Sequence, residues 1–198
     1  MSYSATVFRV MIATPSDVQE EREIVREIIH EWNATHSNTA RLVLLPVGSD
    51  THAVPVMGDR PQEILNEQIL RDCDLLVAVF WRRIGTDTGR APSGTVEEVR
   101  EHLEAGKPAM LYFSNALVAP SSVDQTQYLA LLEFKEQCKT EGLIEEYDSL
   151  DEFRQRFSRQ LQSIVQDELQ PAIPNAELLE EQLAIRTGLS EDAQTLLL

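Results

Sequence analysis

Short apolar runs alternate with longer segments of helical periodicity along this chain. The runs are rich in β-branched and aromatic residues and too short for helices, so each predicts a strand. One run, Cys73–Phe80, is almost continuously apolar, which is typical of a strand that is covered on both faces in a parallel sheet. The predicted strands are Ala5–Ile12, Leu42–Leu45, Cys73–Phe80, Ala109–Phe113 and Leu143–Tyr147.

Each predicted strand is followed by a segment whose apolar residues recur at helical spacing. The first segment opens with Ser16-Asp17-Val18-Gln19, which has the spacing of a capping box with Ser16 as the N-cap. The third ends at Gly106, where a helix C′ glycine is expected. The predicted helices run from Ser16 to about Asn33, from Pro61 through Ile69, from Thr95 to Gly106, from Asp124 to Cys138 and from Ser149 to Leu169.

Five strand–helix repeats predict an α/β fold, a doubly wound parallel sheet with right-handed crossovers and helices on both faces. Among such sheets we expect the strand order 2-1-3-4-5. Residues 1–170 would form this domain, because Pro171 and Pro174 interrupt the pattern. Residues 171–198 would be a linker and a helix over Glu177–Leu198, either a docking tail or the start of a further domain.

The composition and charge of the chain limit the kinds of molecule that it is expected to bind. The chain has 198 residues, a length that suits one domain, and its 33 acidic and 17 basic residues give a formal net charge of −16. This balance argues against direct nucleic-acid binding and against anionic membrane surfaces, which both require clustered Lys and Arg. No apolar run approaches the roughly 20 residues of a membrane span, the N-terminus lacks the layout of a signal peptide, and the two cysteines suit a reducing compartment. We therefore expect a cytoplasmic protein.

The expected topology indicates where a ligand would bind. In open α/β sheets ligands occupy the crevice beyond the carboxyl ends of the strands, at the point where the strand order reverses. Here that crevice lies between the first and third strands, and the N-terminus of the third helix, which favours an anion, opens there as well. The candidate residues are Thr14, Ser16, Asp17, Trp81, Arg82, Arg83, Gly85, Thr95 and Glu98.

Several of these residues have both a functional and a structural interpretation. Arg82 and Arg83 suit a diphosphate, or they form salt bridges with neighbouring acids. Trp81 would stack on a ring or pack in the core, and Asp17 is either accessory or an ordinary first-turn acid. The glycines form neither a GxGxxG fingerprint nor a Walker A loop, so dinucleotide-dependent dehydrogenases and P-loop enzymes are poor matches.

Glu98 also has two interpretations. Thr95-Val96-Glu97-Glu98 fits a capping box, in which Glu98 would bond back to the Thr95 N–H. Alternatively, its carboxylate faces the crevice and stabilises a sugar cation during cleavage of an N-glycosidic bond. His102 lies one turn further along the same side of the helix, where it could orient Glu98 or simply be solvated. This pair does not make a metal site, and none is expected.

Three segments together resemble a bacterial TIR-like family catalogued as domain of unknown function 4062. They are VMIATPSDVQEER (Val10–Arg22), VFWRRIGTDTGRAPSGTVEE (Val79–Glu98) and GKP (Gly106–Pro108). The resemblance implies a flavodoxin-like TIR fold, self-association, and a role as one module of a bacterial defence or signalling protein.

The stretch Ser93–Glu98 is also similar to the S-G-T-x-x-E motif of nucleoside 2-deoxyribosyltransferases, whose glutamate attacks the sugar anomeric carbon. TIR-domain NAD hydrolases likewise use a glutamate on the helix after the third strand. The resemblance therefore implies that Glu98 is catalytic and that NAD or a related nucleotide is the substrate, with no cofactor. The alternatives are a non-catalytic signalling or scaffold module and a deoxyribosyltransferase-like enzyme.

Overall fold

The computed structural model describes residues 2–48, 52 and 61–170. Its strands are β1 (Thr6–Ala13), β2 (Leu42–Val47), β3 (Leu75–Phe80), β4 (Ala109–Ser114) and β5 (Glu145–Tyr147). Its α-helices are α1 (Gln19–Ala40), α3 (Pro61–Gln68), α4 (Gly94–Glu104), α5 (Gln125–Glu141) and α6 (Leu150–Ile164). Short 3-10 turns cover Leu70–Asp72 and Pro120–Ser122, and a π-helical turn covers Val165–Leu169.

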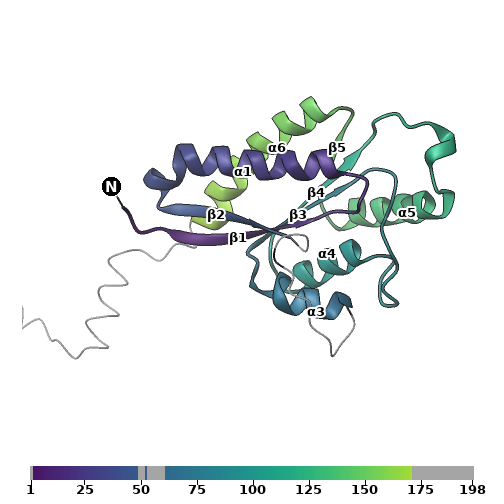
Figure 1. The fold of residues 1–198 in the computed structure, drawn as a ribbon, viewed down its shortest axis with the longest axis horizontal. Coiled ribbons are helices and arrows are strands. Elements are labelled where there is room, and N and C mark those ends of the chain that lie inside the picture. The colour runs from purple at the N-terminus through teal and green to yellow at the C-terminus, as the bar shows by residue number, and fades with distance from the viewer. Residues whose placement is uncertain (1, 49–51, 53–60, 171–198) are drawn as a thin grey trace, which may run out of the picture. The chain divides into compact units, whose positions relative to one another are not determined.

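The strands form one parallel sheet in the order β2-β1-β3-β4-β5, which confirms the predicted fold class and strand order. Helix α1 lies on one face of the sheet, and α3, α4 and α5 lie on the other (Figure 1). The central strand β3 is buried over its whole length, as its unbroken apolar sequence predicts.

Aromatic side chains of β4 alternate between the two faces. Tyr112 makes edge contacts with Phe153 and Phe157 of α6, whereas its neighbour Phe113 packs with Phe80 of β3 and Phe134 of α5. Because successive side chains of a strand point to opposite faces, one strand serves both layers of the core.

The first helix differs from its prediction at both ends. Val18, not Ser16, occupies the N-cap position and makes no side-chain cap bond, so the predicted capping box is wrong. The helix also continues past Asn33 to Ala40, where Arg41 takes a left-handed conformation with φ 54°. Its extra turns make their own contacts: the hydroxyls of Tyr3 and Ser37 lie 2.6 Å apart, and the His36 ring stacks on Trp32 with the ring centres 5.2 Å apart.

The chain divides into two compact units, Met1–Gln162 and Ser163–Leu198. The predicted linker and C-terminal helix over residues 171–198 lie outside the described residues. The predicted fifth helix is interrupted, because α-helical geometry ends at Ile164 and a π-helical turn follows. Within the described part of the chain, no helix is both long and apolar enough to cross a membrane.

Candidate functional site

The loops that follow β1 and β3 carry most of the predicted site residues. These two strands are neighbours in the sheet, and the helices that follow them, α1 and α4, lie on opposite faces (Figure 1). The strand order reverses here, as a doubly wound sheet requires for a ligand crevice.

A cleft of about 520 Å³ lies at this carboxyl edge. That volume falls in the range of small-molecule sites. The cleft is lined mainly by polar residues, which include three acidic residues and one arginine. Its lining residues are Ser16, Asp17, Gln19, Glu20, Glu21, Trp81, Arg82, Ser114, Ala116, Leu117, Tyr147 and Leu150.

Arg82 is already engaged by its neighbours in this cleft. Its backbone N–H donates to Asp17 Oδ2 at 3.2 Å, and its Nε lies 3.7 Å from the same oxygen. The Arg82 guanidinium also lies over the Trp81 ring, 4.6 Å from the ring centre. The indole N–H of Trp81 donates to the carbonyl of Ala116 at 3.0 Å. Asp17, Trp81 and Arg82 therefore line the cleft, as the functional interpretation requires, and they also contact one another, as the structural interpretation requires.

Of the other loop residues, Thr14 is partly buried and Arg83 is exposed. Thr14 Oγ1 accepts from Arg22 Nε at 2.8 Å, which ties the loop after β1 to α1. Arg83 is exposed, and its guanidinium lies 3.4 Å from the hydroxyl of Ser16. Of the two arginines, Arg83 is therefore the more available to a ligand.

Glu98 is not the helix cap that its spacing suggests. Helix α4 begins at Gly94, and the side chain of Ser93 is its N-cap, accepting from the Val96 N–H at 3.1 Å. Thr95, buried with 8% exposure, lies inside the helix. The predicted helix start at Thr95 and its capping box with Glu98 are therefore wrong, because Ser93 two residues earlier satisfies the free N–H groups.

The Glu98 carboxyl is instead buried against α3. The residue is 7% exposed, and Gln62 Nε2 donates to Glu98 Oε1 at 3.0 Å. Burial raises the pKa of Glu98 to about 7, while the Gln62 hydrogen bond acts in the opposite direction. Glu98 does not line the 520 Å³ cleft, so the structure does not bring Glu98 and the arginines into one pocket.

His102 and Gly85 have defined local roles. His102 Nε2 lies 3.1 Å from the Pro108 carbonyl, so it donates there, and burial lowers the pKa of His102 to about 4. This hydrogen bond links α4 to the turn that precedes β4. Gly85 has φ 115°, and a Cβ there would lie 2.9 Å from Cβ of Ser93, so glycine allows the loop to approach the helix cap.

Comparison with known proteins identifies the family. The sequence model described as domain of unknown function (DUF4062) matches residues 9–162, which is most of the chain. The chain belongs to the DUF4062 family. No curated protein is detectably similar to it.

Two solved structures are similar to this DUF4062 domain in a general way. Oxidised flavodoxin 1 from Bacillus cereus shares 16% identity at a TM-score of 0.40, covering 82% of this chain and 99% of the flavodoxin. An azoreductase from Bacillus anthracis shares 10% identity at a TM-score of 0.34, covering 83% of this chain and 96% of the azoreductase.

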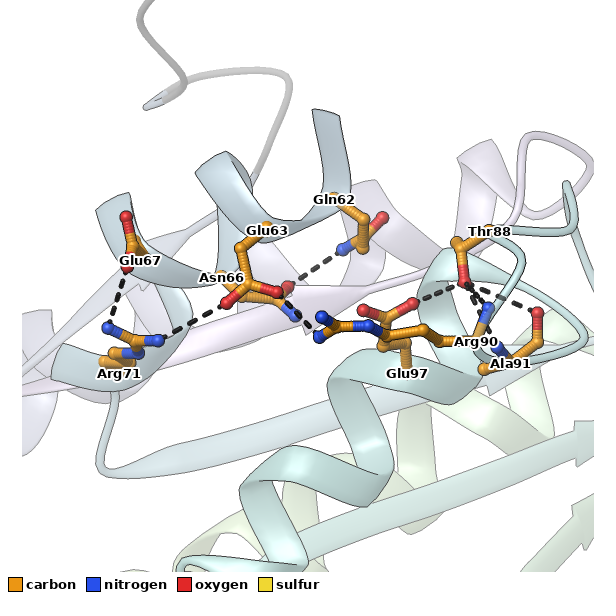
Figure 2. A network of polar contacts seen from close by, with 9 residues as sticks. All are labelled: Gln62, Glu63, Asn66, Glu67, Arg71, Thr88, Arg90, Ala91 and Glu97. Carbon is orange, nitrogen blue, oxygen red and sulfur yellow. Dashed lines mark hydrogen bonds and ion pairs between the residues drawn. The ribbon is translucent and has the colours of Figure 1, made fainter. Parts of the chain in front are cut away.

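Sequence reasoning missed the contribution of α3 to the surroundings of Glu98 in this DUF4062 domain. Figure 2 shows Gln62 and Asn66 of this helix beside the loop that carries Thr88 and Arg90. Arg90 forms an ion pair with Glu63 at 2.9 Å, and the Thr88 hydroxyl donates to Glu97. The ion pair between Arg90 and Glu63 joins residues 27 positions apart in the chain, so no local spacing could have indicated it.

Proposed function

We propose that this DUF4062 domain cleaves the N-glycosidic bond of NAD or a related nucleotide, with Glu98 as the catalytic carboxylate. The proposal is supported chiefly by the burial of the Glu98 carboxyl on the helix that follows β3. This carboxyl does not cap the helix, and it pairs with no cation in the described part of the chain. Buried carboxyls with strongly raised pKa values are concentrated at functional sites.

The chemistry suits a single carboxylate. When the bond between the ribosyl C1′ and the nicotinamide nitrogen breaks, its electron pair leaves with nicotinamide, which departs neutral. Positive charge then develops on the ribosyl group, and an adjacent carboxylate stabilises it. Water adds to C1′ and releases a proton. No strong general acid is required.

The raised pKa of Glu98 is compatible with this role. At neutral pH its carboxyl is divided between protonated and ionised forms, because its pKa is about 7. A nicotinamide ring that carries a positive charge would favour the ionised form on binding, as any cation near a carboxylate does. Substrate binding would thus itself generate the reactive anion.

The rest of the proposal follows the TIR-like resemblance. Self-association would complete the site, and the domain would act as an effector module in bacterial defence signalling. Thr14, Ser16, Trp81, Arg82, Gly85 and Thr95 remain candidate substrate contacts. Arg83 is the candidate for the diphosphate, because it is exposed, whereas Arg82 would first have to leave Asp17.

A non-catalytic signalling module is the second candidate. The observation that favours it is the hydrogen bond from α3 to Glu98, which is also what a structural contact between two helices provides. In that case the charged surfaces of the domain would bind partner proteins, and nucleotides would not be consumed.

A product assay on the full chain separates these functions. Wild type should release nicotinamide from NAD, more efficiently at protein concentrations that favour self-association. Glu98→Gln should stop the release, and Glu104→Gln, an exposed position on the same helix, should not. Turnover by Glu98→Gln equal to wild type would eliminate Glu98 as the catalyst. No turnover at any concentration would favour the signalling module, and base exchange between deoxynucleosides would indicate a transferase.

A further inference from the structure

Gly94, the first residue of α4, lies against the side chain of Gln62 on α3. An ideal Cβ at position 94 would lie 2.3 Å from Gln62 Oε1 and 3.1 Å from Gln62 Cδ. Non-bonded atoms do not approach so closely. Only glycine at position 94 therefore allows Gln62 to occupy its present position.

Gln62 directs its amide nitrogen to two buried side chains. Nε2 donates to Asn66 Oδ1 at 2.9 Å and to Glu98 Oε1 at 3.0 Å, and Figure 2 shows the first of these bonds. Asn66 is fully buried and Glu98 nearly so. The amide nitrogen therefore faces Asn66 Oδ1 and Glu98 Oε1, two acceptor oxygens, and the amide oxygen lies toward Gly94.

We propose that Gln62 is the positioning residue of Glu98, and that the missing side chain at Gly94 provides the space that Gln62 occupies. The bond to Oε1 fixes the direction of the carboxylate. Three residues of the S-G-T-x-x-E stretch thus have linked roles. Ser93 caps the helix, Gly94 leaves room for Gln62 of α3, and Glu98 is oriented by Gln62.

The charges around Glu98 make this bond measurable. Burial and the neighbouring acids Glu97 and Glu101 on α4 favour the protonated carboxyl. From α3 the group that faces Glu98 is the neutral amide of Gln62, whose N–H favours the ionised form. Removing that donor should therefore raise the pKa of Glu98 further.

The test is a pH titration of the Glu98 carboxyl carbon by NMR on the full chain, with its resonance identified by its loss in Glu98→Gln. Gln62→Leu removes the donor, and we expect the midpoint to rise by about one pKa unit, a tenfold change in proton affinity. Gly94→Ala should give a similar rise, because its Cβ displaces the flexible end of Gln62 rather than backbone. Gly142→Ala is the matched control, since a Cβ there meets nothing within 4 Å and its φ is −176°.

An unchanged Glu98 midpoint in folded Gln62→Leu would overturn the positioning role. A rise in Gln62→Leu without one in Gly94→Ala would overturn the role of the glycine. The consequence for catalysis rests on the proposed function, but the titration does not. A raised midpoint in a protein that never releases nicotinamide would uphold Gln62 and refute the hydrolase. If the protein is active, its pH profile should move to higher pH by the same amount in Gln62→Leu.

Discussion

The buried Glu98 carboxyl predicts a specific dependence of stability on pH. Its pKa is about 7 in the folded protein against 4.5 for an ordinary glutamate. Between these two values the folded protein holds a proton that the unfolded chain has released. Unfolding therefore releases a proton, and the stability of the folded state falls as the pH rises through this range.

The magnitude follows from the two pKa values. At 1.36 kcal/mol per pKa unit, the difference between 4.5 and about 7 corresponds to about 3 kcal/mol. Glu98→Gln keeps the shape and an acceptor oxygen for Gln62 but carries no charge at any pH. We expect this variant to match wild type near pH 4.5 and to be more stable by about 3 kcal/mol above pH 7.

Urea denaturation of both proteins, followed by circular dichroism from about pH 5 to about pH 8, measures this difference. Subtracting the variant from wild type at each pH removes the contributions of every other titrating group, His102 included. Glu104→Gln should show no such trend, because that side chain is exposed. A difference between wild type and Glu98→Gln that stays constant with pH would refute the burial argument.

Three further predictions concern other buried or strained positions. Burial lowers the pKa of His102 to about 4, so wild type should lose stability as the pH falls from 6.5 to 4. In a denaturation series over this range, His102→Gln should lose about 3 kcal/mol less unfolding free energy than wild type. Gly85→Ala should lower the melting temperature through a cost of about 1–3 kcal/mol at its left-handed φ of 115°, whereas Gly142→Ala should have little effect by calorimetry. Tyr147→Phe removes the hydroxyl that donates to the buried Glu21 carboxyl at 2.9 Å, and denaturant titration should show a loss of about 1–3 kcal/mol.

The loops around the site could be located from the sequence, but their contacts could not. The run of Trp81, Arg82 and Arg83 after a buried strand indicated the carboxyl edge of the sheet correctly. That Arg82 would bind Asp17 depends on a pair 65 residues apart, and neither residue predicts the other by spacing. The contact between Arg82 and Asp17 therefore became apparent only in the fold, which places β1 beside β3.

The start of α4 is a case in which local chemistry was ambiguous. Ser93, Gly94 and Thr95 include two hydroxyl residues that can each cap a helix, and only one can do so. The structure selects Ser93, whose side chain is fully buried and bonds the Val96 N–H at 3.1 Å. Glu98 is therefore not part of the cap, and its carboxyl accepts a hydrogen bond from Gln62 of α3 instead.

The sequence by itself determined the approximate positions of the strands and helices and, through their alternation, a parallel sheet whose expected strand order the structure confirms. The elements depend on the period of apolar residues, which acts between neighbours in the chain, and the parallel sheet depends on the alternation of strands with helices. Only the tertiary structure decided the surroundings of Glu98. Its partner Gln62 lies 36 residues away on another helix, and the missing Cβ of Gly94 gives that partner its place. Burial, which raises the pKa of this carboxyl, depends on the packing of whole helices, and no stretch of sequence specifies it alone.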